Sequence, residues 1–278
     1  MLLLSGVAPA AAAAEPAPTV CGQVADFRQY REIPGDLVVD GTCYADGLLV
    51  AGDVHVLPGS SWPTYYSRVR GDVHVGDAAS VHMTDVDVRG GLHLDGAASV
   101  TVIGVVGLSV RGRADAVTLA QSRINGAVNV TVPAAVRDTG VRLLRSEVGG
   151  WVNVHGGRTE VAQAWLHRGL TLTAVRASTV SESLVDADVT VRQARARVHV
   201  GDLAWWPGPP GDWAGTWLDD AQPQRSRYAG GLLLLDNAGP VTVGHVDVAG
   251  ALTCTGGRPA PVVDATVTVG GARTGQCA

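Results

Sequence analysis

The chain has 278 residues and a formal net charge of −5, with 21 basic and 26 acidic side chains. Every basic residue is an arginine, which excludes lysine Schiff-base chemistry and a phosphate-loop lysine. A dedicated nucleic-acid-binding protein needs a basic surface, so the charge balance argues against one. A hydrophobic fraction of 46% argues against intrinsic disorder. No run of about 20 apolar residues follows the N-terminus, so we expect no membrane span.

Residues 1–14 have the features of a secretory leader. The apolar run 2–7 is followed by alanine-rich sequence, and small residues precede a cleavage point after Ala14. The segment lacks the basic residues that usually begin such a leader, so an Ala/Pro-rich extension without a targeting role is the alternative. The interpretation as a leader predicts a secreted, extracellular protein.

The four cysteines lie near the two ends of the chain, and none lies in the long stretch between Cys43 and Cys254. An even number of cysteines in an exported chain is typical of disulfides. Four cysteines allow three pairings, and loop length and position favour Cys21–Cys43 and Cys254–Cys277. Their spacing does not cluster ligands as a zinc site requires.

A short unit recurs along the chain: a glycine, one further residue, then two apolar residues that flank one outward position. Examples are 52–56, 71–75 and 90–94. Successive units are mostly 16 to 20 residues apart, and a repeat of this kind with alternating apolar residues predicts a solenoid built from strands. The predicted central outward positions are 38, 55, 74, 93, 109, 129, 153, 171, 190, 233 and 253.

This pattern predicts an all-β, single-stranded parallel β-helix over residues 35–278, with residues 15–34 as an N-terminal cap. We expect about 19 residues per coil and about eleven coils, spaced about 4.8 Å apart by main-chain hydrogen bonds. Inward Val and Leu should stack into aliphatic columns, glycine should permit the tight corner turn, and disulfides should fasten the two exposed ends. By register, Trp62 should point into the core. The handedness is not encoded in any feature of the sequence.

An insertion interrupts the repeat at residues 203–228, where two successive units are 43 residues apart. Aromatic side chains stack on sugar rings and partner surfaces, and long loops are often functional. We therefore predict a binding surface here. The alternative is a flap that packs on the wall of the solenoid. The candidate binding residues are Trp205, Trp206, Trp213, Trp217 and Tyr228.

Two sets of polar residues recur with the coil spacing. His55, His74 and His93 should form an outward ladder, either binding a transition metal or sensing mild acidity, or simply filling a surface column. The second set is a row of aspartates that either ligates calcium or accepts hydrogen bonds from backbone amides at the turns: Asp36, Asp53 and Asp72. The surface-column and turn-capping alternatives are favoured, and we predict no metal or cofactor site.

The sequence resembles a family of exported actinobacterial Gly/Val-repeat β-helix proteins of uncharacterised function. The resemblance rests on the opening Cys21, the segment 35–43, and the closing stretch 250–261 with its Pro-Ala-Pro turn, followed by Cys277. It implies the fold and export, and it brings no activity. The insertion and the histidine ladder depart from the family's pattern.

We predict a monomeric protein with a structural or binding role at the cell envelope, whose partner is an envelope polymer or protein. The alternative is a β-helix that binds or degrades polysaccharide through the insertion. Glycoside hydrolysis needs two carboxyl groups at a defined separation. The sole adjacent acidic pair, Asp219–Asp220, lies in the insertion, so catalysis is not expected.

Overall fold

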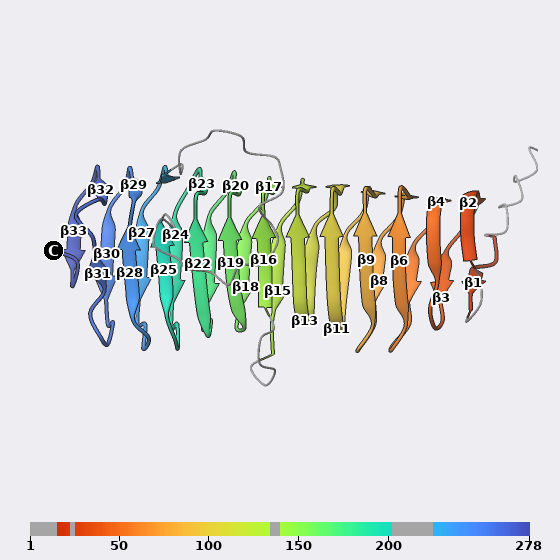
Figure 1. Ribbon diagram of the computed structural model, residues 1–278, viewed down its shortest axis with the longest axis horizontal. Coiled ribbons are helices and arrows are strands. Elements are labelled where there is room, and N and C mark those ends of the chain that lie inside the picture. Colours follow the sequence, from red (N-terminus) through yellow and green to blue (C-terminus); the bar gives the residue numbers. More distant parts are fainter. Residues whose placement is uncertain (1–15, 23–25, 134–139, 202–224) are drawn as a thin grey trace, which may run out of the picture.

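The computed structural model describes residues 16–22, 26–133, 140–201 and 225–278. They form one parallel β-solenoid of about 12 coils with about 19 residues per coil, which confirms the predicted fold. The coils stack in chain order into a rod, with the first and last coils at opposite ends (Figure 1). The described residues form no helix, and therefore none that is long and apolar enough to cross a membrane.

Each coil contributes to three columns of parallel strands, and the first column contains the predicted repeat units. Its members are β1 (Thr19–Cys21), β3 (Leu37–Val39), β5 (Val54–Val56), β8 (Val73–Val75), the first half of β11 (Leu92–Ile103), the first half of β13 (Val110–Ala120), β15 (Val128–Thr131), β18 (Val152–His155), β21 (Leu170–Thr173), β24 (Val189–Arg192), β27 (Leu232–Leu235), β30 (Leu252–Thr255) and β33 (Arg273–Gly275).

The second column continues from the first after a turn, or without a break in the long strands β11 and β13. Its other members are the first halves of β2 (Asp26–Ile33) and β4 (Tyr44–Val50), then β6 (Ser61–Tyr65), β9 (Ser80–Thr84), β16 (Gly140–Leu144), β19 (Arg158–Ala162), β22 (Ala177–Ser181), β25 (Val198–Gly201), β28 (Val241–Gly244) and β31 (Val262–Val263).

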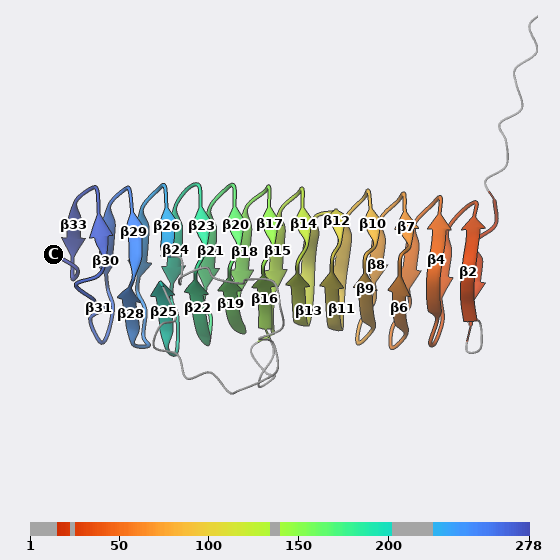
Figure 2. The same cartoon turned by 45° about the horizontal axis from the view of Figure 1, so that its top comes forward.

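The third column consists mainly of very short strands and is seen along one side of the rod in Figure 2. The second halves of β2 and β4 begin it. It continues through β7 (Arg68–Val69), β10 (Asp87–Val88), β12 (Val106–Gly107), β14 (Arg123–Ile124), β17 (Glu147–Val148), β20 (Trp165–Leu166), β23 (Leu184–Val185), β26 (Ser226–Tyr228), β29 (Val246–Val248) and β32 (Thr268–Val269).

The core is a set of stacked aliphatic columns inside the rod. Val54, Val73 and Leu92 pair in register on adjacent coils, and each is fully buried. Burying one such side chain contributes about 1.5–3 kcal/mol, so a stack of them stabilises every interface between coils. Trp62 is also fully buried and pairs with Val81, as predicted from the register.

Glycine recurs at the corner before the first column because neighbouring coils approach closely there. A Cβ on Gly71 would lie 2.6 Å from the carbonyl oxygen of Gly52, which no side chain tolerates. Gly52 and Gly71 do not adopt a positive φ, so glycine is needed here for the close approach of the coils and not for a left-handed turn. Left-handed backbone recurs at the corner between the second and third columns, where Gln121, Arg145 and Gln163 adopt φ values of 51°, 50° and 55°.

The solenoid begins earlier in the chain than the sequence pattern predicts. Strand β1 pairs in parallel with β3, and β2 pairs in parallel with β4, so β1 and β2 belong to the first coil of the solenoid and not to a separate cap. This accounts for about 12 coils where about eleven were predicted.

The insertion also has different boundaries. Strand β26 pairs with β23 and β29, which makes Ser226–Tyr228 the third strand of a regular coil. The interruption therefore lies within one coil, between β25 and β26, and its residues 202–224 lie outside the described residues.

Both predicted disulfides are present, one near each end of the rod. The Cα atoms are 5.7 Å apart in Cys21–Cys43 and 5.4 Å apart in Cys254–Cys277. Each bond joins neighbouring coils at a terminal edge, where unpaired backbone groups would otherwise open or recruit another strand.

We predict that removing Cys21–Cys43 loosens the first coil and leaves the middle of the rod intact. A closed loop of this length stabilises by about 3 kcal/mol in the chain-entropy model. In the C21S/C43S double variant, amide exchange in β1 should accelerate roughly a hundredfold, while exchange in β18 should not change, because stability in a solenoid is set by adjacent repeats. Equal acceleration along the whole rod would contradict this local role.

Candidate functional site

The predicted histidine ladder is present on the outer face of the first strand column. His55, His74 and His93 occupy the same register position on three successive coils. Their rings stack with centroids 4.9 Å and 4.8 Å apart and interplanar angles of 10° and 19°. This spacing is that of adjacent strands, so the backbone dictates the stacking.

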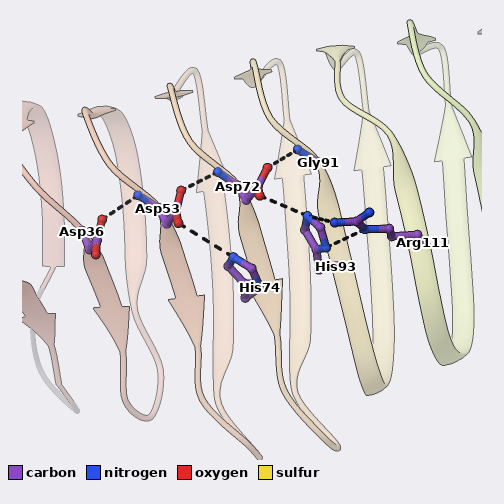
Figure 3. Close-up of polar contacts among 7 residues, drawn as sticks. All are labelled: Asp36, Asp53, Asp72, His74, Gly91, His93 and Arg111. Atoms are coloured by element: carbon purple, nitrogen blue, oxygen red, sulfur yellow. Dashed lines mark hydrogen bonds and ion pairs between the residues drawn. The ribbon is translucent and has the colours of Figure 1, made fainter.

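The column continues to Arg111, where the sequence pattern placed Ser109. Strand β13 begins at Val110, which pairs with Leu92, so Arg111 pairs with His93. The preceding Leu108 has a φ of 33°, and this irregular turn shifts the register by two residues from the prediction. The Arg111 Nε donates to His93 Nδ1 at 2.8 Å, and His93 Nε2 lies 3.2 Å from Asp72 Oδ2 (Figure 3).

The aspartate row lies beside the histidines and holds the coils together. Asp36 Oδ1 accepts the amide of Asp53 at 2.8 Å, and Asp53 Oδ1 accepts that of Asp72 at 2.7 Å. Asp72 in turn accepts the amide of Gly91 at 2.7 Å, as Figure 3 shows. That hydrogen bond is the main cause of the lowered pKa of Asp72. The favoured backbone-capping alternative is correct, although the amide belongs to the next coil.

The arrangement of these ladders suits cohesion between coils better than ligand chemistry. One oxygen of each aspartate is engaged by a backbone amide, and the imidazoles stack face to face. Across the described ranges, no group of three or more His, Cys, Asp and Glu side chains is placed to hold a metal ion.

A second polar cluster follows the third strand column and was missed by the sequence analysis. His167 Nε2 lies 2.9 Å from Glu147 Oε1, and His167 Nδ1 lies 3.1 Å from Asp186 Oδ2. Arg123 donates to the other oxygen of Glu147 at 2.8 Å. The bond to Glu147 is the main cause of the raised pKa of His167, and the bond to His167 is the main cause of the lowered pKa of Glu147.

The same cluster fixes an exposed tryptophan. Trp165 Nε1 donates to Asp186 Oδ2 at 3.1 Å. The ring centroids of Trp165 and His167 are 4.4 Å apart. Trp165 is 45% exposed, and its in-register neighbour Leu184 is 40% exposed. Trp165 and Leu184 together form a small exposed apolar surface. The hydrogen bond from Nε1 holds the indole of Trp165 in one orientation.

Trp165, Leu184 and Asp186 line a groove of about 470 Å³. Its outer side follows the outward positions of β20, β23, β26, β29 and β32, and its floor follows the residues directly after those strands. On the floor, Asp186 is followed by small residues in the next three coils: Ala229, Ala249 and Gly270. These small side chains leave the floor of the groove open.

Four of the predicted binding residues lie outside the described residues: Trp205, Trp206, Trp213 and Trp217. The fifth, Tyr228, is 1% exposed and pairs with Val185 and Val248 inside the rod. Its predicted place on an exposed binding surface is wrong, because β26 continues the solenoid and Tyr228 occupies an inward position. Burial raises the pKa of its hydroxyl.

Comparison with known proteins finds no match among protein-family models, curated proteins or solved structures. The candidate site is therefore the groove beside Trp165, assigned on its geometry alone.

We predict that the aspartate row stabilises the rod measurably. Asp72→Ala leaves the Gly91 amide without its acceptor and should cost about 1–2 kcal/mol in urea unfolding, whereas Asp72→Asn retains an acceptor oxygen and should cost less. Asp87→Ala is the matched control, because Asp87 forms an exposed ion pair with Arg68 and should cost roughly 0.5 kcal/mol. An Asp72→Ala loss no greater than that of the control would refute the role.

We also predict a pH dependence at His167. Its pKa is raised from 6.5, so the stability gained from the protonated ring is fully present below 6.5 and is lost as the pH rises through the raised value. An NMR titration of the ring should show this, and Glu147→Gln should return the pKa towards 6.5. Glu160→Gln, which changes a carboxylate bound to Arg142, should leave it unchanged. Titration of His167 at or below 6.5 in the unaltered chain would contradict the prediction.

Proposed function

We propose that the chain is an exported, non-catalytic β-solenoid that serves as a binding element at the cell envelope. The observation that carries this proposal is the preformed groove beside Trp165, which exposes an oriented indole and a leucine on a rigid rod. A concave surface that combines exposed apolar side chains with a few polar groups is the usual candidate for a ligand-binding site.

Export is supported by the two disulfides and by the leader-like residues 1–14. Disulfides form and persist in oxidising compartments, and here they stabilise the terminal coils. The resemblance to exported actinobacterial Gly/Val-repeat proteins agrees with this assignment and stays a prediction.

Binding is favoured over hydrolysis by the state of the acidic groups. A glycosidase needs a carboxylic acid whose pKa is raised so that it can protonate the leaving group. Glu147 has a lowered pKa instead, and its two oxygens are engaged by His167 and Arg123. Asp247, which lines the groove, is engaged by Arg225 and Thr268.

Fractionation of the source organism tests this proposal. The full chain, tagged at its C-terminus, should appear in the envelope or medium with an N-terminus after residue 14 and both disulfides intact. It should co-sediment with isolated envelope and should release no soluble sugars from envelope polysaccharide or polyuronates. A cytoplasmic chain with free thiols, or release of sugars, would refute the proposal.

A further inference from the structure

We propose that the groove beside Trp165 binds a neutral glycan strand that lies along the axis of the rod. This inference rests on the proposed binding function and names the class of its ligand.

The shape of the groove fits an extended polymer. Its outer side is formed by one residue from each of five successive coils, all in register: Trp165, Leu184, Arg227, Asp247 and Thr268. Figure 2 shows the strands of four of these coils, β20, β23, β26 and β29, side by side. With coils about 4.8 Å apart, the groove extends for roughly 20 Å, which matches several linked sugar rings better than one compact ligand.

The floor of the groove lets a ligand approach the backbone. In the two coils at one end, the position after the third strand is occupied by His167 and Asp186. In the next three coils the same position is occupied by small residues: Ala229, Ala249 and Gly270. Asp186 thus lines one end of the floor, and the three small residues leave an open trough beside it.

The chemistry of the lining fits a sugar strand. An indole face stacks on the C–H face of a pyranose ring, and Trp165 is already oriented by its hydrogen bond to Asp186, which lowers the entropic cost of binding. Arg227 is exposed, and no side-chain partner holds it within the described part of the chain, so its guanidinium is available to sugar hydroxyls. Thr268 and Asp247, whose side chains are hydrogen-bonded to each other, are further polar groups along the strand's path.

The charges favour a neutral ligand over an acidic one. Asp186 and Asp247 lie in the groove with Arg227, and Arg225 pairs with Asp247 at 3.3 Å. Two acidic and two basic groups leave no net positive charge to attract a polyuronate or a nucleic acid strand. A neutral glycan brings hydroxyl groups that pair with both signs of charge.

Calorimetric titration of the full chain with cellohexaose, chitohexaose, mannohexaose and hexagalacturonate tests the inference. At least one neutral hexasaccharide should bind, and Trp165→Ala should weaken that binding roughly tenfold or more. Ala229→His should weaken it similarly while leaving Trp165 in place, because it fills the trough with a residue that the coil accepts at position 167. Trp151→Ala is the matched control and should bind as the unaltered chain does, since Trp151 is 49% exposed but lies outside the groove.

Four outcomes would overturn the proposal: no binding of any neutral hexasaccharide, a preference for hexagalacturonate, equal weakening by Trp151→Ala, or binding that appears only after deletion of residues 202–224. The last result would show that this segment of the chain occupies the groove. Circular dichroism should show the same β spectrum for each variant. If the hexasaccharides fail while the chain still co-sediments with the envelope, the ligand class is wrong and the exported binding rod stands.

Discussion

Parallel hydrogen bonding between successive coils is the constraint on which the rest of the structure depends. It places the equivalent residues of neighbouring coils about 4.8 Å apart, so each position of the coil becomes a column along the rod. Each column must therefore contain residues whose side chains can lie next to the equivalent side chains of the adjacent coils. Val and Leu satisfy this inside, where Val54, Val73 and Leu92 stack without exposed surface. Glycine satisfies it at the corner of Gly52 and Gly71, where a Cβ would strike the backbone of the adjacent coil.

The same constraint determines the polar surface. Like charges stacked at this spacing would repel, and opposite charges on adjacent coils pair at several outer positions, as in Arg68–Asp87 at 3.0 Å and Arg142–Glu160 at 2.8 Å. The aspartate row uses the spacing differently, because each carboxylate reaches the amide of the next coil. The groove lies where the position after the third strand is occupied by small residues in three successive coils: Ala229, Ala249 and Gly270.

The fold could be predicted from the sequence because apolar and polar residues alternate in the strands of the first column, and this pattern recurs once in every coil. The histidine stack, the buried Trp62 and the two disulfides follow from that periodicity and from the even number of cysteines. The predictions that were wrong concern segments in which the repeat is irregular. The first coil lacks the glycine-led unit, the left-handed Leu108 moves Arg111 into the place predicted for Ser109, and Tyr228 follows directly after an insertion.

The groove was not predictable for a related reason. Strands β20 and β23 have two residues each, too few to show an alternating pattern, so the outward positions of Trp165 and Leu184 could not be aligned from the sequence. The contact between Glu147 and His167 depends on that alignment as well. The signal that was available is an aromatic residue beside an apolar one ahead of the next glycine, at 165–166, and it becomes informative once the third column is recognised.

Cysteine pairs on the outer face of the first column test the register most directly. Thr171 and Thr190 pair on adjacent coils, at a spacing of about 4.8 Å, which lies within the range of a disulfide. Asn153 and Thr190 lie two coils apart, at about twice that distance, which is beyond it. Under mild oxidation, mass spectrometry of T171C/T190C should show a rapid cross-link, and N153C/T190C should show none. Equal yields from the two pairs, or a cross-link in the second pair alone, would contradict the stacked register on which the whole account is built.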